Sequence, residues 1–166
     1  VGNTAVLKPA SVTPLTALVL GTMALEAGVP AGVLNVISGP GATAGMALVR
    51  HPGVGKIAFT GETRTGIEIM KAAADTMTRV SLELGGKSPN VIFADADLVR
   101  AIPSTVSAVF SNAGQDCCAR SRVFIEQSIY DRAVLALVEE TRKLRTGDPL
   151  REETQVGSLI SHSHRD

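Results

Sequence analysis

Two adjacent cysteines, Cys117 and Cys118, are the side chains of this sequence best suited to covalent chemistry. They are the only cysteines in 166 residues, and an Asn/Gly-containing stretch typical of a loop separates them from an apolar run ending at Phe110. A cysteine in such a loop acts as a nucleophile when its pKa is lowered and a nearby group moves protons. The alternative is a pair of inert core thiols, the commoner fate of buried cysteine. Asp116 beside them opposes thiolate formation.

The best candidate for moving protons is Glu83, in the stretch Leu82–Leu84 ahead of two glycines. Its apolar neighbours predict burial, which would raise its pKa towards the working range of a general base. The alternative is a structural glutamate in a salt bridge. The three histidines have no ligand-like spacing, so we expect no metal site.

The composition is that of a globular protein and excludes several classes of partner. Hydrophobic residues make up 45% and charged residues 19%, while Lys+Arg and Asp+Glu balance at 16 each. With no net charge and 3% aromatic residues, we expect neither nucleic-acid nor membrane-surface binding. The longest apolar stretch, Leu15 to Leu25, contains Gly21 and is too short to span a bilayer. Because a disulfide between adjacent cysteines is strained, we expect free thiols and a cytoplasmic location.

Strand-like and helix-like segments alternate along the chain, with short connections. We expect strands over residues 5–7, 33–37, 56–59, 79–84, 90–93 and 122–126, and helices over 13–27, 42–49, 64–74, 97–112 and 129–144. This order predicts an α/β fold: a doubly wound parallel Rossmann-like layer, then the start of a second α/β domain. The glycines at 85 and 86 favour a domain boundary there, giving domains 1–86 and 87–166.

Specific residues are expected to begin or interrupt the helices. Thr13 should cap the first helix ahead of Pro14, and Gly28 should end it. Asp97 should cap the fourth helix, which Pro103 should kink or delay. The last helix should turn a set of apolar residues inward: Ala133, Leu137, Val138 and Leu144.

Two stretches are candidates for binding a ligand at the ends of strands. Lys8 follows the first strand, at the edge where ligands bind in such folds, although a plain surface lysine is an equal alternative. The stretch Thr60–Gly66 turns from a strand into a helix, whose free N–H groups can face a phosphate. That stretch alone favours an ordinary turn, because it lacks the dinucleotide-binding glycine pattern.

Taken together, four motifs in order resemble the aldehyde dehydrogenase superfamily over almost the whole chain. They are Gly2–Ala10 (GNTAVLKPA), Phe59–Gly61 (FTG), Glu83–Asn90 (ELGGKSPN) and Gly114–Cys117 (GQDC). The resemblance implies oxidation of a small-molecule aldehyde to a carboxylic acid with NAD or NADP. In this scheme Cys117 attacks the carbonyl to give a thiohemiacetal, hydride transfer leaves a thioester, and Glu83 activates the water that hydrolyses it. Cys118 takes a variable neighbouring position and receives no role.

The resemblance also implies cofactor contacts in the first domain. Lys8 matches a lysine near the adenosine ribose, and Gly41 a glycine against the adenine. Thr60, Gly61 and the helix start up to Gly66 match the pyrophosphate loop. Leu84 matches the residue under the nicotinamide.

Two cofactor positions depart from the common pattern. Ser11 stands where NAD-preferring members often carry a glutamate that holds the ribose hydroxyls, so we expect NADP to be accepted as well as NAD. Glu62 stands where many members have a serine, and its carboxylate must point away from the pyrophosphate, with Arg64 as a possible partner.

Near the nucleophile, Asp116 and Ala113 resemble the aminoaldehyde- or betaine-aldehyde-oxidising branch, in which a carboxylate attracts a cationic substrate. Two alternatives are a CoA-acylating semialdehyde dehydrogenase, whose members generally lack the Glu83 equivalent, and a non-catalytic protein on the same fold. The sequence begins at Val1 without Met, and we interpret it as an interior piece of a longer homodimer or homotetramer. We expect the piece alone to be inactive, because one oxyanion donor of the family lies outside it.

Overall fold

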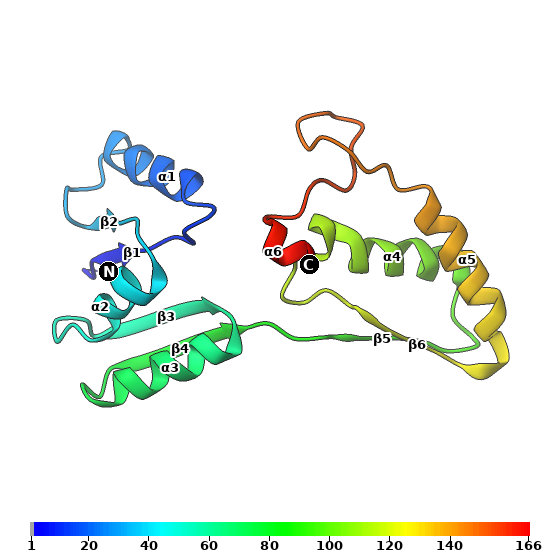
Figure 1. The fold of residues 1–166 in the computed structure, drawn as a ribbon, viewed down its shortest axis with the longest axis horizontal. Coiled ribbons are helices and arrows are strands. Elements are labelled where there is room, and N and C mark those ends of the chain that lie inside the picture. Colours follow the sequence, from blue (N-terminus) through cyan, green and yellow to red (C-terminus); the bar gives the residue numbers. More distant parts are fainter. Residues whose placement is uncertain (1) are drawn as a thin grey trace. The chain divides into compact units, whose positions relative to one another are not determined.

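The computed structural model describes residues 2–166 and contains two compact units, the first ending at Glu83 and the second beginning at Leu84 (Figure 1). Both units are α/β, and strands and helices follow one another along the chain. The assignment of functional domains to residues 1–86 and 87–166 stays a prediction. No helix in the described part, residues 2–166, is both long enough and apolar enough to cross a membrane.

The first unit is built from short strands joined through helices (Figure 1). In order, its elements are β1 (Ala5–Leu7), α1 (Leu15–Glu26), β2 (Leu34–Val36), a π-helical turn (Gly41–Gly45), α2 (Met46–Val49), β3 (Lys56–Gly61), α3 (Thr63–Ala74) and β4 (Arg79–Leu84). Strand β1 runs parallel to β2, with Ala5 opposite Leu34 and Leu7 opposite Val36. Helix α3 packs on β3 and turns its buried positions, Ile69 and Ala73 among them, towards the interior.

The structure explains why glycine occurs at two positions, one within α1 and one just after its end. A Cβ on Gly21 would lie 3.0 Å from Cγ2 of Val36, so glycine allows α1 to approach β2 closely. Gly28 has a φ of 84°, a left-handed conformation that ends the helix as the sequence predicted. The neighbouring Val29 N–H donates to the carbonyl of Ala24 over 2.9 Å.

The second unit places two helices against a pair of strands. Its elements are β5 (Pro89–Ile92), α4 (Leu98–Phe110), a 3₁₀ turn (Ser111–Gly114), β6 (Arg122–Ile125), a second 3₁₀ turn (Gln127–Ile129), α5 (Tyr130–Arg142) and α6 (His162–Arg165). Strands β5 and β6 are parallel, with Pro89 opposite Arg122 and Ile92 opposite Ile125. Helix α4 contacts α5, and the unit's core contains Ile92, Ile102, Val106, Ile129 and Ala133. The side-chain amide of Asn90 donates to the buried Thr105 hydroxyl over 2.9 Å, which ties β5 to α4.

The strands and most helix bounds agree with the sequence prediction to within about two residues, as expected of such boundaries. The single doubly wound sheet is not seen within the described residues. The strands form three separate two-stranded sheets, β1–β2, β3–β4 and β5–β6. Strands β1–β2 and β5–β6 pair in parallel, and within the described residues no continuous layer joins β1–β2 to β3–β4.

Two predictions about helix starts and interruptions were wrong. Thr13 does not cap α1, because Pro14 occupies the N-cap position and the helix begins at Leu15. The N–H of Thr13 donates to the Ala10 carbonyl over 3.2 Å in the preceding turn. Of the two effects predicted for Pro103, a delayed start is wrong, because α4 begins at Leu98 and continues through Pro103 to Phe110, while a kink stays a prediction. Proline has no N–H to donate, so the carbonyl of Val99 lacks its helical partner, and solvent can replace that bond because Val99 is 84% exposed. Asp97 caps this helix as predicted, and its carboxylate accepts from the Val99 N–H over 3.0 Å.

Two predictions of burial also failed. Val138 on α5 is 41% exposed, whereas Ala133 is buried and Leu137 and Leu144 are half-buried, so the apolar stripe is narrower than the sequence indicated. Glu83 is exposed, because residues of β4 alternate between a half-buried face that carries Leu82 and an exposed face that carries Glu83. The burial expected to tune Glu83 is therefore absent from the structure.

Candidate functional site

The loop between α4 and β6 carries Cys117 and Cys118, and both thiols are free and exposed. The alternative of inert core cysteines is therefore wrong for this structure. The loop begins where α4 ends at Phe110 and leads into β6 at Arg122. Helix and strand are parts of the same packed unit, so they fix the two ends of the segment that presents the thiols.

Three successive residues of this loop adopt left-handed backbone conformations. Asn112 has φ 52° and ψ 35°, Ala113 has φ 56° and ψ 32°, and Gly114 has a φ of 74°. Glycine and asparagine tolerate this region, whereas alanine pays on the order of 1–2 kcal/mol for it. Such strain persists only where surrounding contacts enforce the conformation, and it concentrates at functional sites.

Hydrogen bonds hold the loop on both sides of Cys117. Gln115 is bonded to Asn112 through backbone and side-chain groups, and its Oε1 accepts from the Ile160 N–H over 3.0 Å. On the other side, Arg120 N–H donates to the Ala108 carbonyl in α4 over 3.2 Å. Ala119 is buried between these ties. Cys117 is thus an exposed thiol on an anchored segment.

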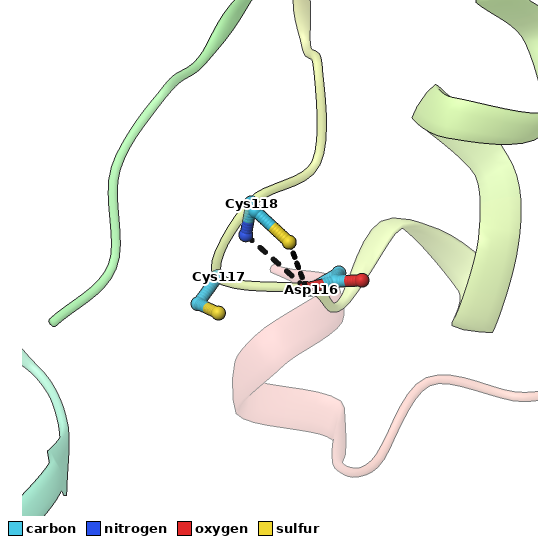
Figure 2. Close-up of side chains that lie close together, drawn as sticks. All are labelled: Asp116, Cys117 and Cys118. Carbon is cyan, nitrogen blue, oxygen red and sulfur yellow. Dashed lines mark hydrogen bonds between the residues drawn. The ribbon is translucent and has the colours of Figure 1, made fainter. Parts of the chain in front are cut away.

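Asp116 distinguishes the two cysteines (Figure 2). Its Oδ1 accepts from the Cys118 backbone N–H over 3.1 Å and from the Cys118 Sγ–H over 3.2 Å, and Cys117 forms neither of the bonds drawn. The bond from its thiol to this carboxylate, together with the negative charge, raises the pKa of Cys118. Reciprocally, the bonds from the Cys118 backbone and then its thiol lower the pKa of Asp116. Cys118 is held as a neutral thiol beside a carboxylate.

Asp116, Cys117 and Cys118 also bring together atoms that could bind a metal ion. The sequence-based expectation about metal sites considered only the spacing of the histidines. The two sulfur atoms and a carboxylate oxygen of Asp116, Cys117 and Cys118 lie within 4.8 Å of one another, and all three residues are exposed. The proximity follows from their being consecutive in the sequence.

Glu83, the predicted general base, closes the first unit at the end of β4. Its side chain is exposed and therefore open to water and to other groups. Leu84, the predicted nicotinamide contact, is the next residue and is half-buried. Their assignment to the site stays a prediction.

In the first unit, the structure brings together two of the predicted cofactor residues. Lys8 Nζ donates to the carbonyls of Pro9 over 2.6 Å and Gly39 over 3.3 Å, and Ser11 Oγ donates to the same Gly39 carbonyl over 3.2 Å. A hollow of about 160 Å³ lies here, lined by Pro9–Ser11, Pro14 and Ser38–Pro40. Gly41 begins the π-helical turn directly after Pro40. Residues from two separate stretches therefore meet at one place beside the ends of β1 and β2.

The second predicted cofactor stretch joins β3 to α3. Thr60 and Gly61 end the strand, Glu62 precedes the helix in an extended conformation, and Gly66 is buried in its first turns. The Glu62 side chain accepts no hydrogen bond from the helix start, and its carboxylate lies 4.0 Å from Arg64 Nε. The expectation that Glu62 turns towards Arg64 is confirmed. The helix N-terminus is left open to an anion.

Sequence reasoning missed the structural part played by Asn112 and Gln115. Both were noted only as members of a loop-forming stretch or of a family motif. One signal was available: asparagine and glycine two residues apart favour left-handed backbone, which a helix followed by a reversal requires.

Comparison with known proteins places these features in a family context. The model of the family described as "Aldehyde dehydrogenase family" matches residues 1–166. The 5-carboxymethyl-2-hydroxymuconate semialdehyde dehydrogenase of Escherichia coli is 54% identical over 163 residues, which cover 98% of this chain and 34% of that protein. The human cytosolic 10-formyltetrahydrofolate dehydrogenase is 51% identical over 164 residues, 98% of this chain and 18% of that protein.

A solved structure agrees in fold as well. Betaine aldehyde dehydrogenase from Staphylococcus aureus in complex with NAD+ superposes with a TM-score of 0.94 at 39% identity, covering 98% of this chain and 32% of that chain. The chain thus spans between about a fifth and a third of the length of these relatives. Their names describe different substrates, so the comparisons fix the family and leave the branch open.

Proposed function

The chain belongs to the aldehyde dehydrogenase family, and we propose that it forms part of an enzyme that oxidises an aldehyde to a carboxylic acid with NAD or NADP. The observation that carries the proposal is the exposed Cys117 thiol on a strained loop tied to its neighbours on both sides. Covalent catalysis requires an accessible nucleophile, and strained backbone that is held in place by its surroundings concentrates at functional sites.

Cys117 carries the covalent chemistry in this proposal. Its thiolate attacks the aldehyde carbon, forming a C–S bond and a thiohemiacetal. Loss of hydride from that carbon leaves an acyl thioester on Sγ. Glu83 takes a proton from water, the resulting hydroxide equivalent attacks the thioester, and the C–S bond breaks to release the carboxylic acid and restore the thiolate. The open position of Glu83 on β4 leaves its carboxylate accessible to water.

The residues present fit a dinucleotide cofactor. Lys8 and Ser11 place donors around the Gly39 carbonyl beside a hollow, and the start of α3 is uncapped. We propose that Lys8, Ser11 and Gly41 hold the adenosine end, that Thr60, Gly61, Glu62 and Gly66 surround the pyrophosphate, and that Leu84 contacts the nicotinamide. When bound, the nicotinamide supplies the acceptor for the hydride. Support comes from the S. aureus relative, whose structure is a complex with NAD+.

The finer assignments follow from the same residues. We propose that residues 1–86 belong to a Rossmann-like cofactor domain and 87–166 to the catalytic domain, within a homodimer or homotetramer. The free thiols support a reducing, cytoplasmic compartment. Hydrolysis is preferred to the CoA-acylating alternative because Glu83 is present, and an active protein releasing free acid without CoA would separate the two.

The experiment that tests the proposal compares Cys117→Ser with Cys118→Ser in a protein carrying this chain at the length of its relatives. We expect Cys117→Ser to lower kcat by at least about a thousandfold, because serine is a far weaker nucleophile without an activating base. The matched Cys118→Ser variant should stay within about threefold of the parent, because Cys118 forms no bond to substrate in this scheme. Activity retained in Cys117→Ser would contradict the proposal and favour a non-catalytic thiol.

A further inference from the structure

We propose that Asn112 and Gln115 are positioning residues for Cys117, and that Gln115 links the nucleophile loop to the chain around Ile160. The inference rests on the proposed function of Cys117, and its consequences for the loop are measurable without turnover. It comes from a set of hydrogen bonds that no part of the reaction scheme uses.

The two amide side chains bind each other's backbone reciprocally. Asn112 Nδ2 donates to the Gln115 carbonyl over 2.9 Å, while Gln115 Nε2 and the Gln115 backbone N–H both donate to the Asn112 carbonyl over 3.1 Å. Three hydrogen bonds therefore close the four-residue segment that contains the left-handed Ala113 and Gly114. These bonds hold the segment in a left-handed conformation that alanine otherwise avoids.

Gln115 also reaches outside the loop. Its Oε1 accepts from the Ile160 N–H over 3.0 Å, a contact between residues 45 apart in the sequence. Gln115 is half-buried, whereas Asp116 and Cys117 after it are exposed. Its side chain therefore uses both ends of the amide: the NH₂ holds the start of the loop, and the oxygen holds a separate segment. This places a fixed point two residues before the reactive sulfur.

Loss of this fixed point should affect the direction of the Cys117 side chain more than the fold of the unit. The core of the unit lies on β5, α4 and α5, and the far end of the loop stays attached through Arg120 and Ala108. A nucleophile displaced by about 1 Å can lose on the order of 10²-fold in rate. The expected signature is a lower kcat in a protein that remains folded.

The test uses three substitutions and one control. Gln115→Met removes both amide functions at similar length, Gln115→Glu keeps an acceptor for Ile160 but loses the donor to Asn112, and Asn112→Gly keeps the left-handed backbone but loses its amide. The control, Gln127→Met, makes the same exchange at an exposed glutamine in the 3₁₀ turn before α5. Each variant carries Cys118→Ser, and alkylation by iodoacetamide is followed by mass spectrometry on the peptide that contains Cys117, so that cysteines elsewhere in the longer protein do not contribute.

We expect kcat to fall by about 10–10²-fold in Gln115→Met and by less in Gln115→Glu. In Gln127→Met, kcat should stay within twofold of the parent value. KM for the cofactor should be unchanged. The rate of Cys117 alkylation across pH should change in the same order. Folded Gln115→Met with kcat and alkylation within twofold of the parent would overturn the proposal. If that variant does not fold, Gln115→Glu and Asn112→Gly decide in the same way. If neither the parent nor the Gln127→Met control turns over aldehyde, the proposed function fails, while the alkylation profile still tests the positioning of Cys117.

Discussion

Cys118 donates both its backbone N–H and its thiol S–H to a single oxygen of Asp116, at 3.1 and 3.2 Å (Figure 2). One carboxylate oxygen thereby holds one of two adjacent cysteines in its neutral form. The thiol next to it in sequence, Cys117, is outside this pair of bonds. The arrangement gives a physical reason for the thiol of Cys118 to ionise less readily than an ordinary cysteine, which the sequence alone does not.

The first prediction concerns the titration of Cys118. Replacing Asp116 by Asn removes the charge and weakens the acceptor that raise its pKa, so the pKa of Cys118 should fall. The pH dependence of alkylation of the peptide that contains Cys118, in a Cys117→Ser background, measures it. A Cys118 titration unchanged by Asp116→Asn would contradict the assignment.

The Asp116–Cys118 pair also makes the stability of the folded state depend on pH. The raised pKa of Cys118 favours the folded state below the unfolded-state pKa of the thiol, and this contribution is lost as the pH rises through the folded-state value. The lowered pKa of Asp116 contributes above its unfolded-state value and is lost as the pH falls through the folded-state value. Both groups are exposed, so the contributions are small.

A second prediction addresses the substrate. The Asp116 carboxylate is exposed and its lowered pKa keeps it charged at neutral pH, so we expect it to favour aminoaldehydes. Asp116→Asn should lower kcat/KM for 4-aminobutanal by about 3–10-fold and leave butanal unchanged, an effect of the size of one partly screened charge. Asp95→Asn, the same change at an exposed position in the turn before α4, serves as control. Equal specificity constants for the two aldehydes in the parent protein would count against this branch.

A third prediction concerns the cofactor. Ser11 is exposed beside Lys8 and donates to the Gly39 carbonyl, and it carries no charge to repel a 2′-phosphate. We expect the parent protein to use NADP as well as NAD, and Ser11→Glu to lower kcat/KM for NADP by about 10²-fold while preserving NAD. Steady-state kinetics with both cofactors measures this. A kcat/KM of the parent for NAD more than about a thousandfold above that for NADP, roughly 4 kcal/mol, would contradict the prediction that NADP is used.

The sequence predicted local structure well where a local signal decided it. The strand predicted over residues 79–84 is β4, and Asp97 was a correct helix cap. It failed where the face of the strand or helix on which a residue lies decided the outcome. Glu83 has apolar residues on either side in sequence, yet strand geometry puts them on the opposite face. Pro103 was expected to delay α4, but the lost hydrogen bond is tolerable because Val99, whose carbonyl lacks its helical partner, is exposed.

The candidate site likewise contains one residue that the sequence identifies and several contacts that it does not. Cys117 could be selected from sequence because only two cysteines exist and one matches a family motif. The Asp116–Cys118 pair and the Gln115–Ile160 bond depend on side-chain directions and on a contact between distant residues. Neither hydrophobic periodicity nor residue spacing encodes such information, so only the structure reveals them.

The most direct test of the central claim is mass spectrometry of the protein after a single turnover with aldehyde and cofactor, in a Glu83→Gln variant at the length of the relatives. Loss of the general base should slow thioester hydrolysis by about 10²–10⁴-fold, so an acyl group should accumulate. Tandem fragmentation of the peptide that contains both cysteines should place it on Cys117, in the parent background and with Cys118→Ser. An acyl group on Cys118, or no acyl-enzyme while acid is still formed, would contradict the account.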